Sequence, residues 1–169
     1  MKLISEKLPH LEALYTQRLR VLLSAEEQIV RYLPHMAEIA TDDELRQVFR
    51  AHVQETEHHC ARLRAILERT AGKAEPMKCK AAEALIAEGE SMVEDADHDA
   101  IRDAALIAAA QSIEHYEIAT YGTARHFARV LGHEEDEALL DQTLQEEGRA
   151  DHRLTGIAER VNPSARKAA

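Results

Sequence analysis

The chain has 169 residues, a length that suits one domain with a sizeable core. Its formal net charge of −10 makes nucleic acid and anionic membrane surfaces unsuitable partners. Tryptophan is absent and Ala, Glu, Leu and Arg are abundant, which predicts an all-α protein with a core of aliphatic side chains and alanine.

The first helical pattern runs from about residue 8 to residue 40, with apolar residues at three- and four-residue steps. Pro34 removes one backbone hydrogen bond, so we expect a kink or a break there. Thr41 and Glu44 have the spacing of a capping box. They predict a second helix that continues to about Ala71 and is stopped by Gly72.

A connector over 73–80 leads to a shorter helical pattern over 81–94 and an acidic turn over 95–99. A third long helix is predicted over about 99–131, and a fourth over about 135–161, ending before Asn162-Pro163. Short connectors join the four long helices into two hairpins, and the longer link between the hairpins can run the length of a bundle. This is the connectivity of a ferritin-like four-helix bundle, with a long crossover that contains a short fifth helix.

We expect residues 1–169 to form a single domain with a frayed tail from about residue 162. Met1 to Glu6 turn charged at once, so no signal peptide is expected, and the longest apolar run, 104–110, is too short to cross a bilayer. Cys60 and Cys79 form neither a CxxC pair nor a disulfide framework. Two inert thiols suit a reducing compartment, which predicts a cytoplasmic protein.

Polar residues fall on the inward stripe of every long helix. Each residue advances about 100° around a helix, so inward positions can be worked out from the sequence. The inward set, with Glu55 and Glu117 on the flanks, is Glu26 in the first helix, His52, Glu55 and His59 in the second, Glu114 and Glu117 in the third, and Glu147 and Asp151 in the fourth.

His58 and Glu146 fall on outward faces by the same reasoning. A motif search would find Glu55-x-x-His58 first, but His58 lies about 140° from the apolar stripe. We therefore favour Glu55-x-x-x-His59 as the ligand pair. His52 and His58 stay open as alternative nitrogen ligands.

Several uncompensated buried carboxylates would strongly destabilise a bundle of this size. Two transition-metal ions at mid-bundle would neutralise them, with one or two carboxylates bridging. Oxygen ligands with one or two imidazoles favour iron, and manganese or zinc would also fit. Ion pairs with Arg18, Arg62 or Arg125 are the alternative for any one helix, but the coincidence over four helices favours metal.

Several segments resemble the YciE/YciF family, over about residues 5–160. The most specific is Asp-Ala-Ala-Leu-Ile-Ala-Ala-Ala-Gln at 103–111, followed by Glu114-His115-Tyr116-Glu117-Ile118. The others are Ala25-Glu26-Glu27-Gln28 with Tyr32-Leu33-Pro34, His52-x-x-Glu55-Thr56, Lys78-Cys79, Tyr121-Gly122-Thr123, and Thr143-Leu144-x-Glu146-Glu147 with Asp151.

The resemblance implies a ferritin-like fold, a homodimer, a rubrerythrin-like di-metal site and a link to bacterial stress response. Rubrerythrin-like proteins usually carry Glu-x-x-His on the second and fourth helices. This chain has Glu55-x-x-x-His59 and Glu147-x-x-x-Asp151 instead. It has no rubredoxin-type cysteine pair, so no attached electron-transfer centre is expected.

Two functions from different classes fit this pattern. The first is redox chemistry on peroxide or dioxygen at a di-iron or di-manganese site. The protein would then be a peroxidase, a catalase or a ferroxidase. If it is an oxidase, Tyr15 or Tyr121 could donate an electron. The second is a stress-induced binding or scaffold dimer with a vestigial or structural metal site. A plain bundle with ion pairs and no metal is the third alternative.

Overall fold

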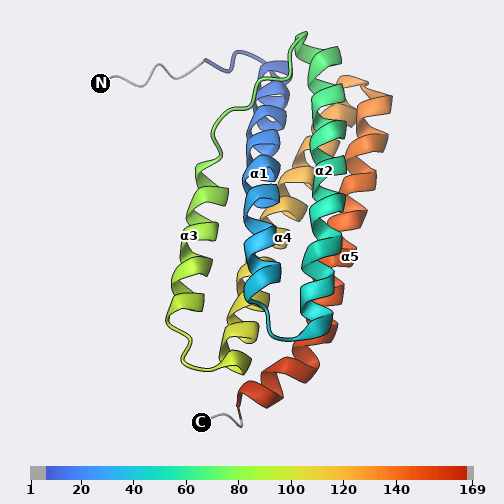
Figure 1. The fold of residues 1–169 in the computed structure, drawn as a ribbon. Helices are drawn as coiled ribbons and strands as arrows, with labels where there is room; N and C mark the ends of the chain where they lie inside the picture. Colours follow the sequence, from blue (N-terminus) through green and yellow to red (C-terminus); the bar gives the residue numbers. More distant parts are fainter. Residues whose placement is uncertain (1–6, 167–169) are drawn as a thin grey trace, which may run out of the picture.

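Residues 7–166 are described in the computed structural model, and over that range the chain forms five helices and no strand (Figure 1). The helices are α1 (Leu11–Ile39), α2 (Asp43–Ala71), α3 (Lys80–Glu94), α4 (Asp99–Leu131) and α5 (Glu134–Ala165). This confirms the predicted all-α bundle of two hairpins. Residues 1–6, on which the signal-peptide expectation rests, and residues 167–169 of the predicted tail lie outside the described residues.

Helices α1 and α2 form one hairpin, α4 and α5 form the other, and the two hairpins pack side by side (Figure 1). The short helix α3 lies in the crossover and packs against α4 and α1. Gly89 allows this packing to be close, because a Cβ atom at that position would lie only 2.7 Å from the Cβ of Ala109. The crossover is therefore held along the outside of the bundle.

The two prolines do not end their helices. Helix α1 continues past Pro34 to Ile39, and α5 continues past Pro163 to Ala165. The break considered at Pro34 does not occur, and the predicted end of the last helix before Asn162 is wrong. Met36 and Ala165 lie beyond the two prolines and are both buried, so apolar packing continues on each side of the lost hydrogen bond.

The N-terminus of α2 differs from the predicted capping box. Asp42, not Thr41, is the capping residue, and its carboxylate accepts a hydrogen bond from the backbone N–H of Leu45 at 3.0 Å. Thr41 instead donates its hydroxyl to Asp103 on α4. Glu44 pairs with Arg160 on α5. The predicted capping residue was one position off, because Thr41 and Glu44 interact with Asp103 on α4 and Arg160 on α5 and not with the end of α2.

The apolar core has two halves, separated by a polar layer. One half includes Met36, Phe49 and Leu154, and the other includes Leu19 and Leu67. Along each long helix, the buried polar residues of the predicted set fall between the segments that enter the two halves. The fold therefore places these side chains at one level in the middle of the bundle.

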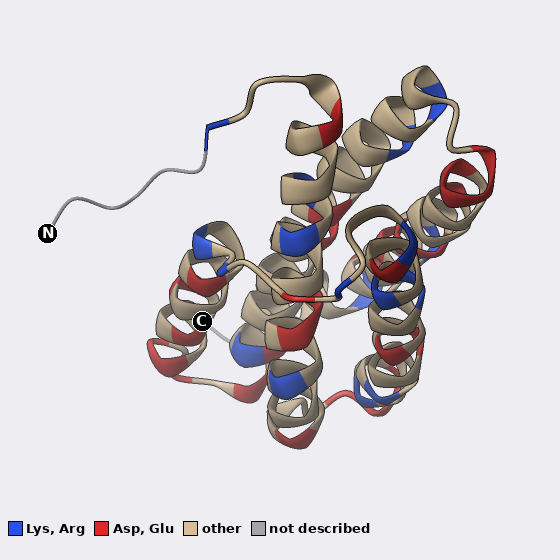
Figure 2. Cartoon of the chain, turned by 90° about the horizontal axis from the view of Figure 1, so that it is seen from above, with Lys and Arg blue, Asp and Glu red and all other residues tan. Residues whose placement is uncertain are grey.

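Charged residues of both signs alternate along the outer faces of the helices and do not separate into an acidic and a basic side (Figure 2). Salt bridges such as Arg64–Glu27 and Arg153–Glu55 connect neighbouring helices there. Exposed pairs of this kind stabilise a fold only slightly. These surface pairs therefore do not account for the carboxylates buried in the polar layer.

Candidate metal centre

Six buried side chains from four helices meet in the polar layer, and none of the six is more than 4% exposed. His52, Glu114, Glu117 and Glu147 offer ligand atoms that all lie within 4.8 Å of one another, and Glu26, His59 and Glu147 form a second group by the same measure. Glu147 belongs to both groups, so its two carboxylate oxygens could bridge two ions. The arrangement suits a two-metal site.

The hydrogen bonding of these groups is incomplete in a way that fits a metal. Both oxygens of Glu117 and of Glu147, and one oxygen each of Glu26 and Glu114, are buried without a hydrogen-bond partner. The Nδ1 atom of His59 lies 2.9 Å from a Glu147 oxygen but outside hydrogen-bonding geometry. Buried polar atoms are normally paired, so a cluster of unpaired ones calls for an additional partner. Cations at the cluster would supply it.

The electrostatics of the cluster lead to the same conclusion. Burial raises the pKa of Glu114 to about 8 and holds the pKa of Glu117 well above its usual range, with the neighbouring carboxylates adding to both shifts. Burial also raises the pKa of Glu147. Four carboxylates match the charge of two divalent ions, which would offset the cost of burying these charges.

His52 presents one nitrogen to the cluster and the other to an outer carboxylate. Its Nε2 lies 3.2 Å from Glu114, and its Nδ1 lies 3.2 Å from Glu55. Glu55 is in turn held by Arg153 of α5 at 2.9 Å. An imidazole whose outer nitrogen is bound by a carboxylate has a fixed ring orientation, as metal-ligating histidines usually do.

His59 repeats this arrangement with residues from a different part of the chain. Its Nδ1 faces Glu147 and Glu26, while its Nε2 lies 3.0 Å from Glu146. Arg62 forms a bidentate salt bridge with Glu146. Burial lowers the pKa of His59, but the nearby carboxylates outweigh that effect and raise it to about 11. In the metal-free protein His59 is therefore a cation that balances part of the cluster's negative charge.

Two of the predicted residues are outside the cluster. Glu55 contacts the outer nitrogen of His52, as described above, and Asp151 accepts a hydrogen bond from Gln111 at 2.9 Å. Their assignment as metal ligands stays a prediction, with no support from this geometry. His58 is exposed, as helical phase indicated. His52, which the sequence analysis left open as an alternative nitrogen ligand, lies in the cluster.

Sequence reasoning missed the role of Glu146, which it placed in solvent. Its side chain is only 17% exposed, because His59 and Arg62 on α2 draw it inward across the helix interface. The signal that could have found it is the spacing of His59 and Arg62, which puts a histidine and a cation on the same face of α2 about one turn apart.

Two tyrosines were also considered in the sequence. Tyr121 is fully buried and donates its hydroxyl to Glu26, so it touches the cluster directly. Burial and the surrounding carboxylates, Glu26 first, hold its pKa well above the usual range, which keeps the phenol protonated. Tyr15 donates to Asp136 at 3.0 Å instead.

A bundle of this kind, with two histidines and four carboxylates in its interior, defines a class: helical-bundle proteins whose buried cluster could hold metal ions. The profile of the family described as a domain of unknown function (DUF892) matches residues 10–166. The chain belongs to this family, and the resemblance to YciE/YciF proteins is confirmed.

Known relatives agree in sequence and in fold. Protein YciF of Escherichia coli K12 is 40% identical over 149 residues, which make up 88% of this chain and 90% of YciF. The crystal structure of that stress protein matches with a TM-score of 0.88 at 38% identity, over 92% of this chain and 99% of the other. YcfI of Rhodopseudomonas palustris matches with a TM-score of 0.87 at 35% identity, over 90% of this chain and 98% of the other. Among residues 7–166, no helix has the length and apolar character needed to cross a membrane.

Proposed function

We propose that this chain is a di-metal carboxylate protein of bacterial stress response. It would hold two transition-metal ions, iron in the first place, and act on a small oxidant such as dioxygen or peroxide. The observation that carries the proposal is the set of buried oxygens of Glu26, Glu114, Glu117 and Glu147 that lack hydrogen-bond partners. The link to stress comes from the relative described as a stress protein.

Each residue has a role that follows from its geometry. Glu147 would bridge, and Glu26 with His59 would complete one position, while His52, Glu114 and Glu117 would complete the other. Oxygen donors with one imidazole at each position suit iron or manganese, and zinc is also compatible. Bound ions would supply redox capacity and an open position for the oxidant.

The protein's own groups prepare this site for the ions. Glu55 and Glu146 hold the outer nitrogens of the two histidines, so the inner nitrogens keep their direction toward the cluster. Tyr121 fixes one oxygen of Glu26 and leaves the other unpaired. The apolar residues on both sides limit the entry of water, which strengthens the electrostatic interactions inside.

The proposal is tested by metal content. Purified protein reconstituted with ferrous iron without oxygen should bind about two ions per chain, and anomalous scattering at the iron edge should place them beside Glu147. Glu147→Gln should lower the content, and the exposed control Glu159→Gln should not. Reconstituted protein without bound transition metal would contradict the proposal.

A second candidate function is a non-catalytic scaffold dimer with a structural metal site. The observation that favours it is the likeness to YcfI, for which a structural role has been suggested. Peroxide consumption and ferrous oxidation separate the two candidates. Equal rates in the unmodified protein and in Glu26→Ala would favour the scaffold.

We propose a homodimer in the cytoplasm under either candidate function. Size-exclusion chromatography with light scattering would test the homodimer, and cell fractionation would test the location.

A further inference from the structure

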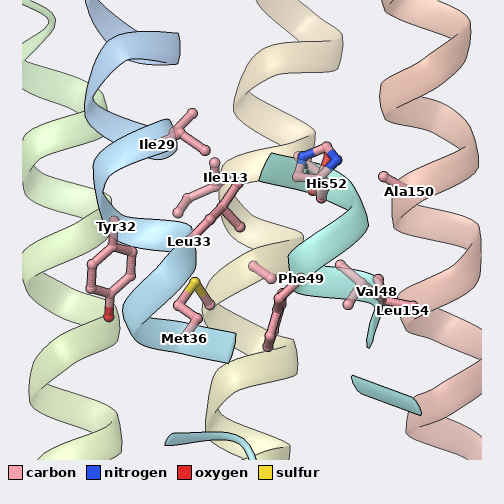
Figure 3. Close-up of a pocket in the computed structure, with 12 residues that line it drawn as sticks. Ile29, Tyr32, Leu33, Met36, Val48, Phe49, His52, Ile113, Ala150 and Leu154 are labelled. Atoms are coloured by element: carbon pink, nitrogen blue, oxygen red, sulfur yellow. Dashed lines mark ion pairs between the residues drawn. The ribbon is translucent and has the colours of Figure 1, made fainter. Parts of the chain in front are cut away.

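A small apolar cavity lies directly beside the metal-holding residues (Figure 3). Its lining comes from all four long helices and includes Ile29, Leu33, Met36, Phe49, Ile113 and Leu154. His52 and Glu114 are the members of the candidate metal centre that reach it. In Figure 3 the ring of His52 lies above Phe49.

The size of the cavity limits what it can hold. It offers about 10 Å³ for the centre of a water-sized sphere, which is close to the smallest space that accepts one such molecule. Its walls are buried, since Met36, Phe49 and Leu154 are each no more than 1% exposed. An occupant must therefore be very small, such as a diatomic gas.

The chemistry of the lining decides which small molecule is favoured. Apart from His52, Glu114 and Tyr32, the residues that line the cavity are apolar. A buried water normally makes about three hydrogen bonds, and a cavity with so few polar groups favours an apolar occupant over water. Hydrogen peroxide has two donors and several acceptors, so its transfer into this lining costs free energy in the same way. Dioxygen is apolar and needs no hydrogen bond.

We propose that this cavity is a dioxygen-binding site that holds the gas next to His52 and Glu114. The proposal goes beyond the proposed function, which leaves the oxidant open. Only a reaction of the bound dioxygen would depend on the proposed function. The binding itself depends on the shape and the apolar character of the cavity.

The test is methyl NMR of the purified protein, kept free of paramagnetic metal, under equal pressures of dioxygen and of nitrogen. Dissolved dioxygen is paramagnetic and speeds the relaxation of protons close to it. Leu33, Ile113 and Leu154 should show a several-fold larger excess relaxation than Leu19 and Leu67, which are buried in the other half of the core. Equal excess relaxation in both halves would overturn the proposal.

Two matched variants on α4 locate the gas. Ala110 lines the cavity and Ala128 lies in the other half of the core, and both are buried alanines. Ala110→Val should remove the excess at Leu33 and Leu154, while Ala128→Val should leave it. Persistence of the excess in a folded Ala110→Val protein would overturn the proposal. If that variant does not fold, the comparison of the two core halves in the unmodified protein still decides.

The outcome is separable from that of the proposed function, because the relaxation measurement does not require bound metal. A protein that binds two ions but shows no excess relaxation at the cavity would refute the dioxygen site alone. A protein that binds no metal but shows the excess would refute the proposed function and support the site.

Discussion

The Nε2 atom of His59 lies 3.0 Å from a carboxylate oxygen of Glu146, across the interface between α2 and α5. The contact leaves the Nδ1 atom of His59 facing Glu26 and Glu147. Burial raises the pKa of Glu146, but its bonds to Arg62 and Gln142 outweigh burial and lower it to about 2, so the group is charged at neutral pH. Glu146 therefore orients His59, whose other nitrogen faces the candidate metal centre.

Removal of Glu146 should weaken metal binding without removing a ligand. For Glu146→Ala we expect the affinity for zinc to fall by about 10–100-fold, because the ring of His59 loses its fixed orientation. Competition with a chelator of known affinity would measure the change. Glu159→Ala, at an exposed position of the same helix, is the control, and equal affinities for both variants would show that Glu146 does not position the ligand.

Glu117→Gln should change stability in opposite directions with and without metal. Glu117 is fully buried, and burial together with the neighbouring carboxylates holds its pKa well above the usual range, so folding of the metal-free protein requires the side chain either to bind a proton or to be buried as a charge. An amide avoids this requirement, and we expect the metal-free variant to gain about 1–3 kcal/mol of unfolding free energy. With metal, the variant should be the less stable protein, because a ligand charge is lost.

Urea denaturation with chelator and with added zinc measures both differences for Glu117→Gln. The exposed control Glu57→Gln should show neither. A variant that is less stable than the unmodified protein under both conditions would contradict the explanation based on the buried charge.

The metal-free protein should lose stability as pH rises from about 4.5 to about 8. The folded-state pKa of Glu114 is about 8, above the model-peptide value of 4.5, so the native state binds more protons than the unfolded state in this window. This contribution is complete below pH 4.5 and is lost as pH passes the folded-state pKa. Denaturation of chelator-treated protein at pH 5 and pH 8 would detect it, and Glu114→Gln should show a smaller difference between the two values.

Asp103 should matter for stability rather than for metal binding. It is buried and accepts hydrogen bonds from the backbone N–H groups of Thr41 and Asp42 and from the Thr41 hydroxyl, at 2.6–2.9 Å. Asp103→Ala should lower the unfolding free energy by about 3 kcal/mol, since it leaves these donors unpaired. Thermal unfolding would measure the loss. Asp97→Ala, at an exposed position, should change stability little, and an equal loss in both variants would refute the proposed role of Asp103.

The sequence alone predicted most of the architecture because helices obey local rules. The apolar period defined the long helices to within a few residues, and Gly72 and Gly132 ended α2 and α4 in left-handed conformations as expected. The predicted helix end before Asn162 was wrong, and the break considered at Pro34 does not occur, because local rules count the lost hydrogen bond but not the apolar packing beyond it.

By itself, the sequence determined that Glu26, His52, His59, Glu114 and Glu147 point toward a common interior, because helical phase depends only on position along one helix. Only the tertiary structure decided the partners of Glu55, on the flank of its helix, and of Glu146, which helical phase had placed on an outward face. Glu55 forms a salt bridge with Arg153, and Glu146 contacts His59 and Arg62. In both cases the partner is a basic side chain on the neighbouring helix, which the sequence of one helix cannot indicate. The cavity beside His52 likewise depends on four helices at once, and no single stretch of sequence encodes it.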